Sequence, residues 1–254
     1  MAIALAIKTT AEETKMSRAA AVAGAVLTRP AQARALPMST ATDRGSSELE
    51  RIGVAMLCRK GQALVQEGDR AEYIYKVTSG ALRAVRLLPD GRRYIANFLM
   101  PGDFIGLTEG ESYGHSIEAI SDAGLLRYPR SSFETLLDRD PRAGRRFFGV
   151  MCKELTAVQD RLLLLGRKTA TERLASFLLA MAGRKAGNGN GNGRARVELP
   201  MNRSDMADYL GLRIETVCRL LTDLKARRII DLPDIHSVVV LRRDDLEDLS
   251  EAGV

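Results

Sequence analysis

Cysteine, histidine and tryptophan are scarce in this sequence of 254 residues, which contains three Cys, two His and no Trp. The cysteines, Cys58, Cys152 and Cys218, lie far apart in the chain, and no CxxC pair occurs. This spacing argues against a disulfide framework, a zinc site or a cysteine-held iron–sulfur cluster. Because only His115 and His236 are available, and GxSxG, HExxH and P-loop motifs are absent, we expect no enzyme, no metal and no cofactor.

Long apolar runs are also absent, since none reaches the roughly 18 residues that a membrane-spanning helix needs. The excess of positive charge is small, with 38 Lys and Arg against 32 Asp and Glu. Residues 168–230 contain 12 Lys and Arg but only 6 Asp and Glu, and therefore hold the whole excess of +6. Such a basic segment is typical of a nucleic-acid-binding module, although the solvated face of an ordinary helix gives the same count. We expect a cytoplasmic protein with two domains and no membrane contact.

The first 46 residues are rich in alanine and show no pattern of a packed domain. An apolar stretch at 19–27 and the tripeptide Ala33-Arg34-Ala35 weakly resemble a secretion signal. The positive charges are misplaced for such a signal, because a nearly neutral start precedes them. We interpret residues 1–46 as a flexible tail, with Met16 as an alternative start.

Short β-rich runs separated by turns extend from Gln62 to about Tyr128, which is typical of a β-sandwich or barrel. The runs 81–88 and 93–99 predict a hairpin that closes through Pro89-Asp90-Gly91. In that turn proline sets the bend, and glycine tolerates a positive φ. A second turn that contains glycine, Pro-Gly-Asp-Phe-Ile-Gly, follows at 101–106.

A long helix is predicted to begin after Asp140, because Pro141 suits the first turn of a helix. Its apolar residues are alternately three and four positions apart, which predicts the a/d seam of a parallel two-helix dimer. The seam consists of Phe148, Met151, Leu155, Val158, Leu162 and Leu165. The same spacing also suits a single helix that packs on its own barrel. A second helix is predicted at about 171–182, followed by a glycine–asparagine loop at 187–193.

Two short helices are predicted near the C-terminus. Asn202 can cap the first helix, with Asp205 as the reciprocal acid of a capping box. The turn Gly211-Leu212-Arg213 leads into a second helix from Ile214 to about Arg227. A helix, a glycine turn and a helix within about 25 residues predict a helix-turn-helix unit.

The second of these helices has two distinct faces. One face is predicted to pack and contains Ile214, Val217, Leu221 and Leu224. The other is predicted to be free and contains Glu215, Cys218, Arg219 and Thr222. Two further runs, 229–232 and 237–241, predict a two-stranded wing around Pro233-Asp234.

Motifs in both halves carry a resemblance to a known family. Gly68-Asp69, Val77-x-x-Gly80 and the motif at 101–106 resemble the effector barrel of the CRP/FNR superfamily of bacterial transcription regulators. The run at 202–221, NRSDMADYLGLRIETVCRLL, closely resembles the recognition unit of FNR-type members. The resemblance covers about residues 47–250, and within the superfamily the chain is most similar to the FixK-like branch.

The resemblance implies an α+β fold. A cyclic-nucleotide-binding-like β-barrel (jelly roll) is followed by a long dimerisation helix and a C-terminal winged helix-turn-helix. The expected segments are a flexible tail at 1–46, the barrel at 47–140, the dimerisation helix at 141–167 and the DNA-binding domain at 168–254.

The implied function is sequence-specific DNA binding. A homodimer would bind the palindrome TTGA-N6-TCAA in double-stranded DNA and, with RNA polymerase, activate genes of low-oxygen or nitrogen-fixation-type metabolism. Arg219 suits guanine O6 and N7, Glu215 can accept from cytosine N4, and Arg203 is placed for a phosphate. The DNA-binding set consists of Arg203, Glu215, Thr216, Cys218 and Arg219. The alternative for Glu215 and Arg219 is an exposed ion pair without a role in recognition.

Cys218 departs from the FNR pattern, which has serine at this position. A thiol beside Arg219 in a basic surface favours the thiolate and therefore oxidation. We expect that oxidation of Cys218 adds bulk and negative charge and weakens DNA binding, so that Cys218 is a redox-regulatory residue. The alternative is an inert thiol that replaces the serine hydroxyl.

The barrel lacks residues that hold cyclic AMP in other family members. Leu107 stands in place of the glutamate that contacts the ribose, and His115-Ser116 stands in place of the Arg-Ser pair that holds the phosphate. Residues 1–57 contain none of the cysteines that the family's oxygen-sensing cluster needs. We therefore expect regulation without an intrinsic effector. The alternative is an effector-gated sensor whose barrel binds a small ligand, either a nucleotide or a haem held by His115.

Overall fold

The computed structural model describes residues 49, 51–108, 110–185 and 195–251, which all belong to one compact unit that spans residues 43–254. The predicted tail at 1–46 and the predicted loop at 187–193 lie outside the described residues. In the part that is described, no helix is long and apolar enough to cross a membrane.

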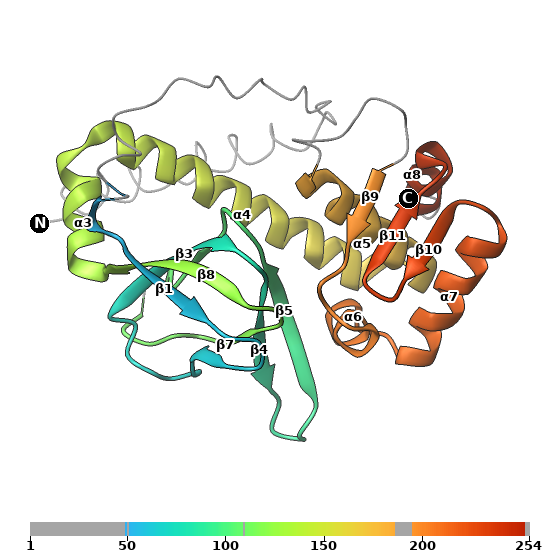
Figure 1. The fold of residues 1–254 in the computed structure, drawn as a ribbon, viewed down its shortest axis with the longest axis horizontal. Coiled ribbons are helices and arrows are strands. Elements are labelled where there is room, and N and C mark those ends of the chain that lie inside the picture. The colour runs from blue at the N-terminus through green and yellow to red at the C-terminus, as the bar shows by residue number, and fades with distance from the viewer. Residues whose placement is uncertain (1–48, 50, 109, 186–194, 252–254) are drawn as a thin grey trace, which may run out of the picture. The chain divides into compact units, whose positions relative to one another are not determined.

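Strands in the first half of the described chain form a β-barrel of two four-stranded sheets (Figure 1). The strand orders are β1-β8-β3-β6 and β2-β7-β4-β5, and all pairings are antiparallel. The strands are β1 (Val54–Cys58), β2 (Ala63–Val65), β3 (Tyr73–Ser79), β4 (Leu82–Leu87), β5 (Arg93–Leu99), β6 (Phe104–Ile105), β7 (Ser116–Ala119) and β8 (Ala123–Pro129). The predicted barrel is therefore confirmed, and β1 is a strand that the sequence pattern did not indicate.

The predicted hairpin between β4 and β5 is present. Its register pairs Leu82 with Leu99 and Leu87 with Arg93. Gly91 has a φ of 82°, and the Leu88 amide donates to the Arg92 carbonyl at 2.9 Å. The turn therefore has the backbone conformation for which glycine was expected.

A helical segment follows the barrel: α3 (Arg130–Arg139) and α4 (Pro141–Arg167). Asp140 caps α4, since its carboxylate accepts from the Arg142 amide at 2.8 Å, and Pro141 occupies the first turn. The ring of Phe147 lies 6.0 Å from that of Phe104 in the barrel, centroid to centroid. One side of α4 thus packs on the barrel of its own chain.

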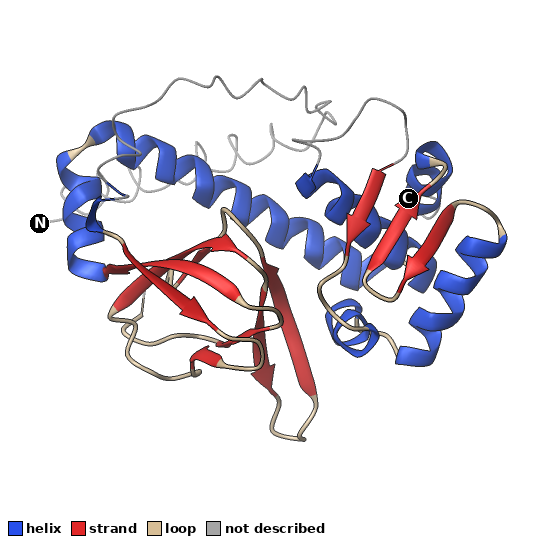
Figure 2. Ribbon diagram, viewed as in Figure 1, coloured by secondary structure: helices blue, strands red, loops and turns tan. Residues whose placement is uncertain are grey.

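The C-terminal half combines helices with a small sheet (Figure 2). Its elements are α5 (Ala170–Lys185), β9 (Ala195–Glu198), α6 (Arg203–Leu210), α7 (Ile214–Ala226), β10 (Ile230–Asp234), β11 (Ser237–Val240) and α8 (Arg243–Glu251). The wing was predicted with two strands, but β9 pairs with β11 and makes three. Periodicity could not indicate β9, because the strand has only four residues and its partner β11 begins 39 positions later.

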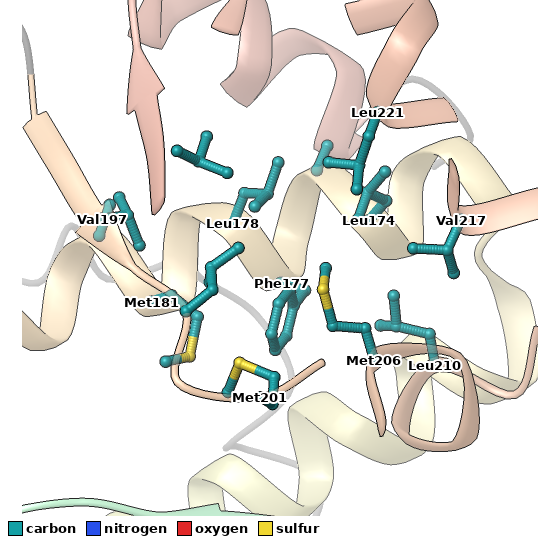
Figure 3. Close-up of a cluster of buried hydrophobic side chains, with 14 of the residues drawn as sticks. Leu174, Phe177, Leu178, Met181, Val197, Met201, Met206, Leu210, Val217 and Leu221 are labelled. Carbon is teal, nitrogen blue, oxygen red and sulfur yellow. The ribbon is translucent and has the colours of Figure 1, made fainter. Parts of the chain in front are cut away.

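Helix α5 forms the centre of the C-terminal core (Figure 3). Leu174, Phe177, Leu178 and Met181, which the sequence placed on one face, are all at most 6% exposed. They belong to one cluster with buried residues of α6 and α7. The same cluster contains Val85, Ile95 and Phe98 of the β4–β5 hairpin, so the hairpin and the C-terminal half share a continuous apolar core.

Candidate nucleic-acid interface

Helix α6 begins and ends with the predicted caps. The Asn202 side chain accepts from the Asp205 amide at 2.7 Å, which satisfies a free N–H of the first turn. Gly211 ends the helix with φ 63° and ψ 40°, and its N–H donates to the Ala207 carbonyl. The left-handed conformation at Gly211 reverses the chain, so that α7 can pack beside α6.

The reciprocal half of the predicted capping box is wrong. The Asp205 carboxylate does not turn back to Asn202 but accepts from Arg83 and Arg93 of the β4–β5 hairpin, each at 2.7 Å. Asp205 is only 1% exposed, so its charge is neutralised by two arginines from a distant part of the sequence. Sequence spacing could not reveal partners that are more than 100 positions away.

The packing face of α7 agrees with its pattern at three of the four predicted positions. Val217, Leu221 and Leu224 are 0%, 2% and 1% exposed. Ile214 was predicted to be buried with them but is 42% exposed. Ile214 is the first residue of α7. Periodicity along α7 does not indicate how far the elements that pack against this helix extend towards its first residue.

The opposite face of α7 is free. Glu215, Cys218 and Arg219 are exposed, whereas Thr216 is half-buried. In the part of the chain that the structure describes, neither Glu215 nor Arg219 has an ion-pair partner, so the two side chains do not form the exposed ion pair that was the alternative. Thr222 turns its hydroxyl back to the Cys218 carbonyl at 2.9 Å. Glu215, Cys218 and Arg219 therefore present unengaged polar groups on one surface.

Arg203 lies at the start of α6 and is half-buried. Its Nη1 is 3.3 Å from the sulfur of Met206. Burial lowers the pKa of the Arg203 guanidinium, while Cys218 and Asp234 raise it. The structure thus brings Arg203 into the neighbourhood of Cys218, for which the sequence had suggested only Arg219 as a cationic neighbour.

The wing turns sharply between β10 and β11. Asp234 accepts from the His236 amide and from the Ser237 hydroxyl, both at 2.7 Å. Both hydrogen bonds lower the pKa of the Asp234 carboxyl, and the bond from Ser237 has the larger effect. Arg196 of β9 adds a contact to Asp234 at 3.2 Å. Arg196 is a basic residue of this surface that the sequence pattern missed, because β9 itself was missed.

Most of the predicted seam of α4 is exposed in the single chain, although Met151 also lines the barrel cavity beside α4. Five of the six seam residues are exposed, whereas Leu165 is half-buried. The exposed residues are Phe148 (70%), Met151 (38%), Leu155 (59%), Val158 (53%) and Leu162 (69%). A row of large apolar side chains in water is unfavourable and indicates a surface for a partner.

The barrel contains a cavity of about 230 Å³ beside α4, lined by residues that include Leu107, His115 and Glu154. Burial, together with Arg86, lowers the pKa of His115, so its imidazole is neutral near pH 7. The Ser116 hydroxyl accepts from the Glu67 amide at 3.0 Å. A neutral imidazole and an engaged hydroxyl do not form the cationic site that a cyclic phosphate needs.

Comparison with known proteins agrees with this architecture. A family model described as a cyclic nucleotide-binding domain matches residues 56–140, and one described as a Crp-like helix-turn-helix domain matches residues 172–249. The chain is 38% identical over 247 residues to the nitrogen fixation regulation protein FixK of Azorhizobium caulinodans, and the match covers 92% of this chain and 99% of the relative.

Two further matches extend this result. The chain is 34% identical over 207 residues to the transcriptional activator protein FnrL of Cereibacter sphaeroides, which covers 81% of this chain and 83% of that protein. The structure of FixK2 from Bradyrhizobium japonicum superposes with a TM-score of 0.73 at 38% identity, and the match covers 80% of this chain and 100% of that one.

Proposed function

Because this chain belongs to the CRP/FNR family of DNA-binding transcription regulators, we propose that it acts as a homodimeric activator at the palindrome TTGA-N6-TCAA. The observation that carries the proposal is the division of α7 into two faces. Val217 and Leu221 are buried in the core, whereas the side chains of Glu215, Cys218 and Arg219 are exposed. A helix with this division can enter the major groove without losing its packing.

The side chains on the free face match the edges of the proposed bases. Arg219 donates two hydrogen bonds to guanine O6 and N7, and Glu215, one turn earlier, accepts from cytosine N4. Thr216 and Cys218 lie beside them in the DNA-binding set. Arg203 at the start of α6 binds a phosphate and so fixes the register without selecting a sequence.

Dimerisation through the α4 seam places two such helices on one palindrome. The exposed apolar side chains of the seam, such as Leu155 and Leu162, repeat with the a/d spacing of a parallel coiled coil. A twofold dimer matches a twofold DNA site, and each protomer binds one half-site. The dimer then works with RNA polymerase at genes of low-oxygen or nitrogen-fixation-type metabolism. The nitrogen-fixation part of this proposal is supported by the name of the FixK relatives, nitrogen fixation regulation protein.

The test compares two arginines with different roles. Arg219→Ala is expected to reduce the preference for TTGA over a changed guanine by about 1 to 3 kcal/mol. Arg203→Ala is expected to weaken binding to all sequences alike. It should also reduce the slope of log K against log salt concentration by about 1, as for the loss of one phosphate contact. Fluorescence anisotropy with matched and mutated duplexes measures both effects. An unchanged base preference in Arg219→Ala contradicts the proposed role of this residue.

We further propose that oxidation of Cys218 weakens DNA binding. Its thiol is exposed on the DNA-binding face near Arg203, and a sulfinic or sulfonic acid there brings negative charge towards the DNA phosphates. Cys152 is a second exposed thiol, on α4, and serves as a matched control, whereas Cys58 is buried.

Peroxide treatment followed by a mobility-shift assay tests this proposal. The wild type and Cys152→Ser should lose DNA binding, and Cys218→Ser should retain it. Equal loss in all three proteins refutes a regulatory role for Cys218.

A second candidate function, effector gating, is supported by the cavity around His115. A neutral imidazole is a suitable haem ligand but a poor phosphate partner. A visible absorption spectrum of the purified protein distinguishes the haem form. Titration with cyclic AMP, followed by the affinity for DNA, tests a nucleotide effector, and we expect no response.

A further inference from the structure

Four elements of the fold meet at the ring of Tyr209, in the last turn of α6. The ring centroid of Tyr209 lies 5.1 Å from that of Phe98 in β5 and 5.5 Å from that of Phe177 in α5. The guanidinium of Arg161, from α4, lies 3.8 Å from the same centroid. The barrel, the long helix and the DNA-binding half therefore converge on one small cluster, in which Figure 3 labels Phe177.

Arg161 also joins these parts by hydrogen bonds. Its Nη2 donates to the Ile95 carbonyl of β5 at 2.7 Å and to the Tyr209 carbonyl of α6 at 2.9 Å. Among the described residues, Nε and Nη1 of Arg161 are buried without an acceptor. The position of the side chain therefore depends on the hydrogen bonds of Nη2, on the stack against Tyr209 and on the ring of Tyr94, whose centroid lies 5.5 Å from the guanidinium.

Helix α6 is held at both of its ends. Asp205 in the first turn and Asp208 in the second each lie 2.7 Å from Arg93 of the β4–β5 hairpin. At the last turn, the Leu210 carbonyl accepts from Arg173 of α5 at 3.1 Å, beside the bond from Arg161. The acid Asp205 at the first turn and the arginines of neighbouring helices at the last turn both suit the helix dipole. With both ends anchored, α6 has little freedom to rotate relative to α4.

We infer that Arg161 is a positioning residue that sets which spacing between half-sites the dimer accepts. The inference rests on the proposed function, because it requires a dimer joined through α4 and a palindrome. Helix α7 packs on α6 through the shared core, and Arg161 connects α6 directly to α4. One base pair more or less in the spacer moves a half-site by about 3.4 Å and rotates it by about 35°. If α6 is held firmly, α6 and α7 cannot shift to reach the displaced half-site. If α6 is held loosely, both helices can move with the half-site.

The experiment measures the affinity of the full-length protein for three duplexes, TTGA-N5-TCAA, TTGA-N6-TCAA and TTGA-N7-TCAA. The wild type is expected to prefer N6 over N5 and N7 by at least about tenfold. Arg161→Met, which loses the hydrogen bonds and the cationic stack, is expected to reduce that preference by about fivefold. Arg161→Lys retains the charge and a donor and should recover most of the preference.

Two further variants make the test specific. Tyr209→Leu removes the stack from the other side, so it should lower the N6 preference even if Arg161→Met does not fold. Arg70→Met removes an arginine that is exposed on the barrel and should behave as the wild type.

The outcomes separate the inference from the proposed function. If the wild type shows no preference for N6, the palindrome proposal fails. If the wild type prefers N6 and the folded Arg161→Met and Tyr209→Leu variants keep the same ratios, the inference is overturned. An equal loss of affinity on all three duplexes also overturns it, because that is the effect of lost stability alone.

Discussion

The carboxylate of Asp205 in α6 lies 2.7 Å from the guanidinium of Arg83 in β4. The side chains are 2% and 20% exposed, so this ion pair is largely shielded from water. Arg83 also lies 2.6 Å from Glu118 of the neighbouring strand β7. The first helix of the DNA-binding unit is thereby tied to the barrel by charge as well as by apolar packing.

This relationship predicts a strong effect of Asp205→Asn on stability. Asp205→Asn removes the buried negative charge that Arg83 and Arg93 share and leaves each arginine with one acid, Glu118 and Asp208, so the weakened charged hydrogen bonds should cost about 1.5 to 3 kcal/mol. Asp208→Asn is the matched control, because the Asp208 side chain is 27% exposed and its change should cost less than about 1 kcal/mol. Urea unfolding curves measure both variants. Similar losses of unfolding free energy in the two variants would show that burial does not increase the contribution of Asp205 to stability.

The exposed seam of α4 predicts that charge on it separates the dimer. The double variant Leu155→Glu/Leu162→Glu places like charges on both helices of the proposed contact and should yield monomers. The monomers should bind a single palindrome at least about tenfold more weakly than the dimer does. Gln159→Glu, exposed on α4 but outside the seam, is the control. Light scattering after size-exclusion chromatography gives the mass, and a dimeric mass for the double variant contradicts the seam.

The core around α5 predicts a large cost for removing a buried side chain. Leu178 is 0% exposed, and Leu178→Ala should lower the free energy of unfolding by about 2 to 5 kcal/mol. Leu87 is 69% exposed near the tip of the hairpin, so Leu87→Ala should change stability by less than about 0.5 kcal/mol. Thermal and chemical unfolding measure the stability of both variants. The two carry the same substitution, one at a buried and one at an exposed position.

The position of His115 predicts a dependence of stability on pH. Burial lowers its pKa in the folded protein, so the unfolded chain, with a histidine pKa of about 6.5, takes up the proton first as the pH falls. Stability therefore decreases as the pH falls below about 7. The decrease between pH 7 and pH 5.5 should be smaller in His115→Gln than in the wild type.

Much of the candidate interface could be predicted because its signals are local. The cap at Asn202, the left-handed turn at Gly211 and the buried face of α7 each depend on residues within one or two helical turns. The hairpin turn at Gly91 is local in the same way. The helical periodicity was wrong at Ile214, because the exposure of this side chain depends on how far the neighbouring elements extend along α7.

The sequence by itself determined the succession of barrel, long helix and helix-turn-helix, the division of α7 into two faces and the apolar seam of α4, because periodicity and turn chemistry act between near neighbours. Only the tertiary structure decided that Asp205 pairs with Arg83, that Arg161 joins Ile95 to Tyr209, and that β9 completes the wing. These partners are between 39 and 122 positions apart. Their contacts depend on how helices and strands pack against one another. The spacing of hydrophobic residues along one element does not indicate which polar group of another element will lie beside it.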